Sequence, residues 1–357
     1  MSRLARGRLI DRVLLAALVL FCVVFIAWPI GSFVWQAVAP GSSSAPIADV
    51  LAQNARVLSN SAFVGLLTSL LSCALALAVA LVLTFGPVRW ARVVEALVTV
   101  SMISPPFVAS LAYIELFGRR GLVTHGLLGL SVSPYGWWGV VLMQSLFFAA
   151  INVILIRSVL ERVDRIAVQE ALDLAAPMDR VFLDVIVPLL RPALAVCLLL
   201  TFVRSISDYA TPVVIGGKFE TIATQIYVRV VGYSDLGGAA ALNLVLFCVA
   251  SIAFAAYRRL SEAGGMTSGS LGTSLRPAPG EAGFRLRGVL GALCHVTCAA
   301  FVVFLAVLYA TIVHAAFTKG MGWSAPFTLD NLEHLVEYNM ETIGRSVAYS
   351  LLSALLS

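Results

Sequence analysis

Long apolar runs separated by short polar segments dominate the hydrophobic pattern of this chain. Seven runs reach the length of roughly 20 helical residues that crosses a hydrocarbon core of about 30 Å; they lie at 13–37, 62–86, 94–117, 136–160, 193–215, 238–257 and 288–317. Apolar and polar positions do not alternate within the runs, which argues against a β-barrel, and helices satisfy their own backbone hydrogen bonds without water. The pattern predicts an all-α polytopic membrane protein.

The composition agrees with this prediction. Hydrophobic residues make up 60% of the chain and charged residues 12%, about half the charged share of a soluble domain. The first run follows four arginines, as in a signal peptide, but it is too long and lacks a cleavage site, so we expect it to remain as a span. Cys294, His295 and Cys298 share one helical face; a metal site is one interpretation, but we expect the cysteines to be apolar packing residues, and we assign no metal.

The distribution of basic residues predicts the orientation. With a cytoplasmic N-terminus, sixteen basic residues fall on the cytoplasmic side and seven on the opposite side, in agreement with the rule that basic loops stay inside. The net charge of +5 is explained by this asymmetry, and we expect no nucleic-acid partner.

A Gly-, Ser- and Pro-rich segment at 259–287 predicts a flexible cytoplasmic linker that divides the chain. Residues 1–258 would form a first domain with six spans, and 288–357 the start of a second. SAFVGLLTSLLS at 61–72 aligns without gaps to SVAYSLLSALLS at 346–357 with six of twelve positions identical, which indicates an internal repeat. The last apolar run forms only about 20 Å of helix, so we expect the chain to stop inside an eighth span.

A charged segment, ERVDRIAVQEALDLAAPMDRVFLDVIVP at 161–188, interrupts the apolar pattern on the predicted cytoplasmic side. Apolar residues three and four apart from Val163 onward predict a short amphipathic helix, and Pro177 predicts a bend after it. Asp179 can cap a second short helix that ends before Pro188. From the residues alone, we expect the pair to rest on lipid headgroups.

This segment resembles the cytoplasmic EAA loop of binding-protein-dependent ABC importer permeases, in which a Glu-Ala-Ala start is followed by a Gly and by a helix ending in Leu-Pro. Gln169 occupies the acidic position with Glu170 one residue later, and Ala175 replaces the turn glycine, while the spacing to Pro188 is kept. In that family the loop docks in a groove of the ATPase subunit. The resemblance implies ATPase coupling through Gln169, Glu170, Ala171, Asp173, Ala175, Ala176, Pro177, Phe182 and Pro188.

Segments 101–129 and 205–232 resemble the ferric-iron branch of these permeases, whose members often fuse two permease halves in one chain. The resemblance implies a type I-like helical bundle that acts as the transmembrane subunit of an ATP-driven importer for ferric iron in the bacterial inner membrane. It implies three partners: a cytoplasmic ABC ATPase dimer, a periplasmic solute-binding protein and a second permease half, fused or separate. Phosphonate, polyamine and thiamine permeases share much of the pattern and give the alternative cargoes.

Ionisable residues within a predicted span mark a candidate translocation pathway. Arg204 and Asp208 lie four apart in the fifth span, where each charge costs about 2.5–3.5 kcal/mol on insertion scales. A helix-internal ion pair and the lining of a water-filled pathway both account for them. Ser205 and Tyr209 add hydroxyls, and Thr211-Pro212 predicts a local break.

Polar residues in other spans have competing interpretations. Pro105-Pro106 should kink the third span. Glu115, which follows them, belongs to an outer gate or pairs with Arg119, and we expect the pair. Gln144, Asn152 and Asn243 are expected to form hydrogen bonds between helices.

The chain has no G-x-x-x-x-G-K-[ST] loop, so we expect no cofactor here and ATP bound by a partner subunit. A secondary transporter driven through Arg204 and Asp208 is the less favoured function, because it leaves the cytoplasmic loop unexplained. No spacing typical of catalytic residues supports an enzyme. The sequence predicts a transport component.

Overall fold

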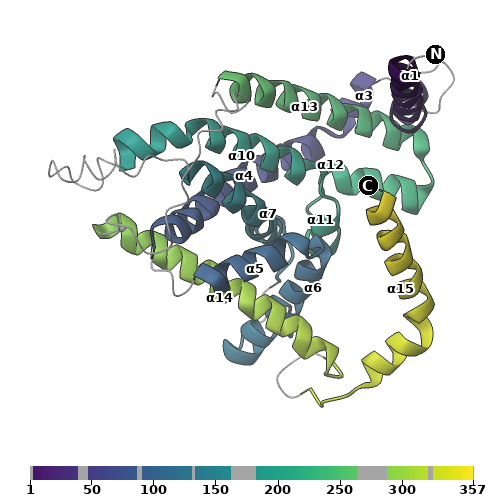
Figure 1. The fold of residues 1–357 in the computed structure, drawn as a ribbon. Helices are drawn as coiled ribbons and strands as arrows, with labels where there is room; N and C mark the ends of the chain where they lie inside the picture. Colours follow the sequence, from purple (N-terminus) through teal and green to yellow (C-terminus); the bar gives the residue numbers. More distant parts are fainter. Residues whose placement is uncertain are drawn as a thin grey trace.

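The computed structural model describes residues 3–38, 47–86, 91–130, 133–161, 182–263, 288–320 and 325–356. Within these ranges every regular element is helical, apart from one isolated antiparallel bridge between Thr318 and Phe327 (Figure 1). Six helices are long and apolar enough to cross a membrane, and a bent pair of helices raises the number to seven. The predicted all-α polytopic architecture is confirmed.

The first span is an almost continuous helix with one irregular turn. α1 (Arg3–Cys22) passes through a π-helical turn, η1 (Val23–Ala27), into α2 (Trp28–Val38). Trp28 N–H bonds to Val23 O, five residues back, immediately before Pro29. Because proline has no N–H to donate, the helix widens at this point instead of losing more of its hydrogen bonds. α2 packs on α13 (Leu236–Ala263).

Three helices form the centre of the bundle: α4 (Ala55–Phe85), α7 (Trp137–Leu160) and α10 (Val187–Ser207). The short helix α3 (Ile47–Gln53) precedes α4. A Cβ atom on Gly65 would lie 2.9 Å from Ile206 Cγ2 and from ring carbons of Phe202. Only glycine allows α4 and α10 to approach this closely.

The third predicted span is broken. α5 (Ala91–Ile103) ends before Pro105-Pro106, and α6 (Pro106–Phe117) begins there, with a bend of 111° between the two arms. The predicted kink is confirmed and is large, because neither proline can donate a backbone hydrogen bond across the junction. A π-helical segment, η2 (Leu122–Leu127), follows α6.

The fifth predicted span is also broken. α10 ends at Ser207 and α11 (Ala210–Ile215) starts after Asp208 and Tyr209, so the break lies just before the predicted Thr211-Pro212. Pro212 falls in the first turn of α11, where backbone N–H groups have no helical partner in any case. α12 (Ile222–Tyr227) and the π-helical turn η4 (Val228–Gly232) connect α11 to α13.

α14 (Gly288–Ala316) crosses α4 and α6 and carries Cys294 and Cys298 in the hydrophobic core. After the bridge, Lys319 Nζ donates a 3.0 Å hydrogen bond to Asp330, which lowers the pKa of that carboxyl. α15 (Asp330–Leu356) has no buried residue and runs along the outside of the bundle (Figure 1). The apolar run at 346–356 is the last part of this helix, which is not one of the candidate spans.

Candidate functional site

The predicted coupling segment lies largely outside the described residues. Residues 162–181 are not described, and they include Gln169, Glu170, Ala171, Asp173, Ala175, Ala176 and Pro177. The structure does describe both attachments of the segment: α7 leads into it at Leu160, and Phe182 leads out of it. The described residues therefore show how this segment connects to the spans.

The residues that follow the segment pack into the hydrophobic core. Phe182 begins a π-helical turn, η3 (Phe182–Ile186), which continues directly into α10. Phe182 packs against the core, and Ile186 and Leu190 are fully buried. The prediction that a helix ends before Pro188 is wrong. Pro188 directly follows the π-helical turn, as Pro29 follows η1, and the wider turn accommodates the residue that lacks an N–H.

Two buried amides connect the helices that flank the segment. Asn152 Nδ2 on α7 donates to Ser72 Oγ on α4 at 3.0 Å and to Thr201 Oγ1 on α10 at 2.8 Å. Gln144 lies about two turns away on α7 and accepts hydrogen bonds at Oε1 from Thr68 and Ser205. The predicted role of Asn152 and Gln144 between helices is confirmed, whereas Asn243 forms no side-chain hydrogen bond with the described residues.

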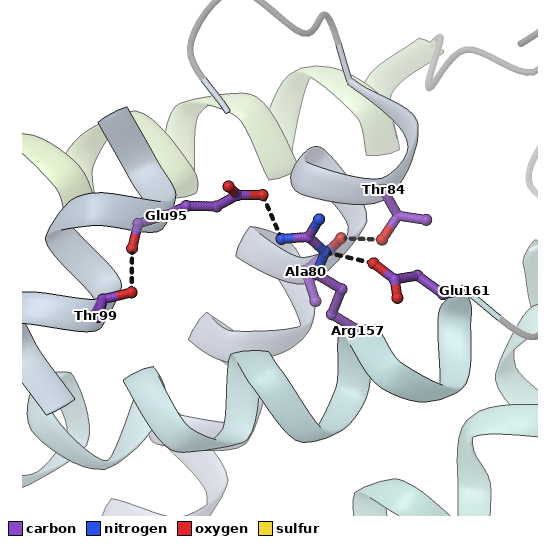
Figure 2. A network of polar contacts seen from close by, with 6 residues as sticks. All are labelled: Ala80, Thr84, Glu95, Thr99, Arg157 and Glu161. Atoms are coloured by element: carbon purple, nitrogen blue, oxygen red, sulfur yellow. Dashed lines mark hydrogen bonds and ion pairs between the residues drawn. The ribbon is translucent and has the colours of Figure 1, made fainter. Parts of the chain in front are cut away.

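An ion-pair network lies where α7 leads into the predicted coupling segment. Arg157 Nη1 donates to Glu95 Oε1 of α5 at 2.5 Å, and Arg157 Nε donates to Glu161 Oε1 at 2.9 Å (Figure 2). These three side chains line a cleft of about 390 Å³ with Leu83 and Val98 among the others. The network therefore ties α5 to the end of α7.

A second cavity lies at the two helix breaks. It has a volume of about 340 Å³, and its lining comes from the end of α5, from the middle of α7 and from the end of α10: Ser101, Met102, Ser104, Phe147, Phe148, Ile151, Arg204, Ser207 and Asp208. Both predicted ionisable pathway residues of the fifth span are in this set. Arg204 and Ser207 are exposed, so the cavity opens to the surface of the chain.

Arg204 and Asp208 face this cavity without forming an ion pair. Asp208 Oδ2 accepts from Gln144 Nε2 at 2.9 Å, and Oδ1 accepts from the backbone N–H groups of Ala210 and Thr211 at 2.9 and 3.3 Å. The Arg204 guanidinium lies 5.8 Å from the ring centroid of Phe148. The helix-internal pair, one of two interpretations of the sequence, does not form, because α10 ends at Ser207 and Asp208 is extended.

The other predicted pathway residues lie elsewhere. Ser205 is buried and donates to Gln144 Oε1 at 2.6 Å. Tyr209 is half-exposed and stacks on Tyr227 with 5.1 Å between ring centroids. Glu115 on α6 is 8% exposed, and its Oε1 atom has no hydrogen-bond partner among the described residues. The expected pair with Arg119 is wrong, because α6 ends at Phe117 and the helical spacing is lost.

Sequence reasoning missed the α5 and α7 contributions to the cavity. Ser101, Ser104 and Phe148 carry no local signal of their own. The Pro105-Pro106 pair was such a signal, since a sharp break brings the residues before it to a helix junction. Glu95 and Arg157 are separated by 62 positions, so their pairing could not be inferred from spacing.

Comparison with known proteins identifies the family. The family model described as "Binding-protein-dependent transport system inner membrane component" matches residues 73–263. The chain belongs to this family. The match includes the predicted coupling segment and the helices on both sides of it.

Curated relatives of the permease carry several cargo names. A Haemophilus influenzae chain named for ferric transport, FbpB 1, is 30% identical over 338 residues, 90% of this chain and 52% of that one. The ferric transport system permease protein FbpB of Actinobacillus pleuropneumoniae is 30% identical over 330 residues, 89% of this chain and 47% of its own length. The molybdenum permease ModB of Escherichia coli is 30% identical over 161 residues, 43% of this chain and 68% of that one. The permease spans about half the length of the two ferric relatives.

A solved structure supports the fold. The crystal structure of a bacterial ABC transporter that imports the acidic polysaccharide alginate superposes with a TM-score of 0.57 at 16% identity, covering 72% of this chain and 99% of that chain. The bundle is therefore an ABC importer permease fold, as the resemblance implied.

Proposed function

We propose that this permease forms one half of the translocation pathway of an ATP-driven importer for ferric iron in the bacterial inner membrane, with its N-terminus in the cytoplasm. The family match over 73–263 carries the proposal. The names of the two ferric relatives support the cargo, and the basic residues near the N-terminus support the orientation.

The proposed mechanism starts from the segment between α7 and α10. A cytoplasmic ABC ATPase dimer would move this segment when ATP closes the dimer. Because Asn152 hydrogen-bonds α7 to both α4 and α10, the three helices would move as one unit. Arg157 would hold the start of α5 to α7, so their displacement would act at the far end of α5, where it would open or close the cavity that contains Arg204 and Asp208.

Two further partners complete the proposal. A periplasmic solute-binding protein would select and deliver the cargo, and a second permease half would face the exposed side of Arg204 and Ser207. A pathway between two bundles alternates its opening when they tilt relative to each other. ATP is bound by the ATPase partner in this proposal, and this chain holds no cofactor.

Uptake of labelled ferric iron tests the proposal. The transporter is reconstituted in vesicles with its ATPase and the solute-binding protein, and uptake is compared with ATP and with a non-hydrolysable analogue. We expect ferric iron to accumulate only with ATP and the binding protein. Uptake that persists without the ATPase would indicate a secondary transporter, and ATP-driven uptake of another solute alone would overturn the iron assignment.

A further inference from the structure

The cavity at the helix breaks has an unequal balance of hydrogen-bond donors and acceptors. Asp208, the carboxylate among the described residues that line it, already accepts three protein hydrogen bonds, from Gln144 and from two backbone N–H groups of α11. Of the roughly four acceptor positions of a carboxylate, three on Asp208 are therefore occupied, although its negative charge remains.

Two donor groups of the cavity, on Arg204 and Ser101, have no hydrogen-bond acceptor in the part of the chain that the structure describes. Arg204 has five N–H donors and a permanent positive charge. Its guanidinium lies over the ring of Phe148. Among the described residues, no carboxylate or carbonyl accepts from its guanidinium. Ser101 is 1% exposed, and its hydroxyl has no hydrogen-bond partner among the described residues.

A buried hydroxyl without a partner costs about 1–3 kcal/mol, and the guanidinium of Arg204 is free to bind an anion that enters the cavity from its open side. A ligand rich in anionic oxygen atoms would satisfy both groups at once. Phe147, Phe148 and Ile151 line the rest of the cavity with apolar surface, which lowers the local dielectric and strengthens the attraction of Arg204 for an anion.

We propose that this cavity is an anion-selective site on the pathway, with Arg204 and the Ser101 hydroxyl as ligands of anionic oxygen. The inference rests on the proposed import function and refines it. Ferric iron would pass only with its charge covered by carboxylate or phosphate oxygens, and a free oxyanion has the same recognition chemistry. A bare polycation would gain little here, because the charge of Arg204 offsets that of Asp208.

A thiol probe tests the charge of the cavity without reference to cargo. Ser207 lies three residues from Arg204 on the same face of α10. Ser207→Cys is made in the full transporter after the two exposed cysteines, Cys22 and Cys248, are replaced by serine. Modification rates are measured with a sulfonate-bearing and a trimethylammonium-bearing methanethiosulfonate, each normalised to a free thiol in solution.

We expect the anionic reagent to react faster, and Arg204→Gln to lower the anion-to-cation rate ratio about tenfold. Arg204→Lys should keep most of the ratio, which separates loss of charge from loss of folding. Arg191→Gln is the matched control, because it removes a positive charge from the same helix about 20 Å away. A ratio that is unchanged by Arg204→Gln overturns the inference.

Uptake of three labelled solutes then identifies the source of the anionic oxygen: ferric iron presented as its citrate complex, molybdate and spermidine. Loss of iron or molybdate uptake in Arg204→Gln, with ATPase activity retained, supports the site and names its cargo class. Spermidine uptake that is insensitive to Arg204 overturns it. If the wild-type transporter takes up none of the three, the proposed function fails, whereas the thiol ratio still reports on the cavity.

Discussion

At the scale of single residues, buried amides connect the three central helices of this permease, whereas the Arg157–Glu95 ion pair joins α5 to α7 at a partly exposed site. Gln144 and Asn152 each reach side chains on two other segments. An amide can donate and accept at once, and it carries no charge to desolvate. Such residues hold helices together in a medium where hydrophobic burial gives no drive for helix association.

Replacing Asn152 with leucine should therefore weaken the bundle. Asn152→Leu keeps a similar volume but removes the donors to Ser72 and Thr201, and we expect a loss of about 1 kcal/mol of unfolding free energy. Denaturation by sodium dodecyl sulfate in mixed micelles would measure it. Asn243→Leu is the matched control, since Asn243 makes no side-chain hydrogen bond with the described residues. Equal losses in both variants would contradict the role of Asn152.

Spacing alone failed at two charged pairs, and the same physical reason applies to both. Arg204 and Asp208, like Glu115 and Arg119, are four positions apart and would meet on a continuous helix. In each pair the helix ends between the two residues. Where a helix ends within a membrane depends on packing and capping, which local sequence determines only in part.

At the scale of elements, the apolar runs and the prolines predicted most of the fold. All seven predicted spans correspond to helices, with the third as the bent pair α5 and α6. The sequence did not predict which helices pack against each other. The cavity forms where α5, α7 and α10 meet, and tertiary packing determines this meeting point. The error at Pro188 arose because a π-helical turn, which local sequence does not signal, lets the helix pass through this proline.

Removing the two prolines should straighten the third span. We expect Pro105→Ala with Pro106→Ala to let α5 continue into α6, because alanine restores the missing N–H donors. Spin labels at Val93 and Leu111, both exposed, report the geometry. A straight helix would separate their backbones by about 27 Å, whereas the 111° bend brings them much closer. An unchanged distance in the double variant would show that packing, rather than proline, maintains the bend.

At the scale of the whole molecule, the helices on either side of the predicted coupling segment are the best-connected part of the bundle. α7 and α10 both pack on α4, and the exit from the segment is anchored by Phe182 and Ile186. A force applied between Leu160 and Phe182 would therefore reach the centre of the bundle rather than its edge.

Deleting residues 169–177 tests the proposed docking of an ATPase subunit on this segment. We expect the deletion to abolish copurification of the ATPase while membrane insertion, measured by carbonate-resistant membrane association, is retained. Deleting the nine residues 265–273, which lie in the Gly- and Ser-rich stretch of similar predicted location, is the matched control. If the ATPase copurifies equally well after both deletions, the docking role of 169–177 is wrong.

The cavity between α5 and α10 also has a pharmacological consequence. Its volume of about 340 Å³ lies at the lower limit for small-molecule sites, it is open on one side, and the helices that flank it separate or close in every cycle of the proposed mechanism. A compact inhibitor with an acidic head beside Arg204 and an aromatic body against Phe148 would act as a wedge. It would arrest transport while leaving the nucleotide site of the motor untouched.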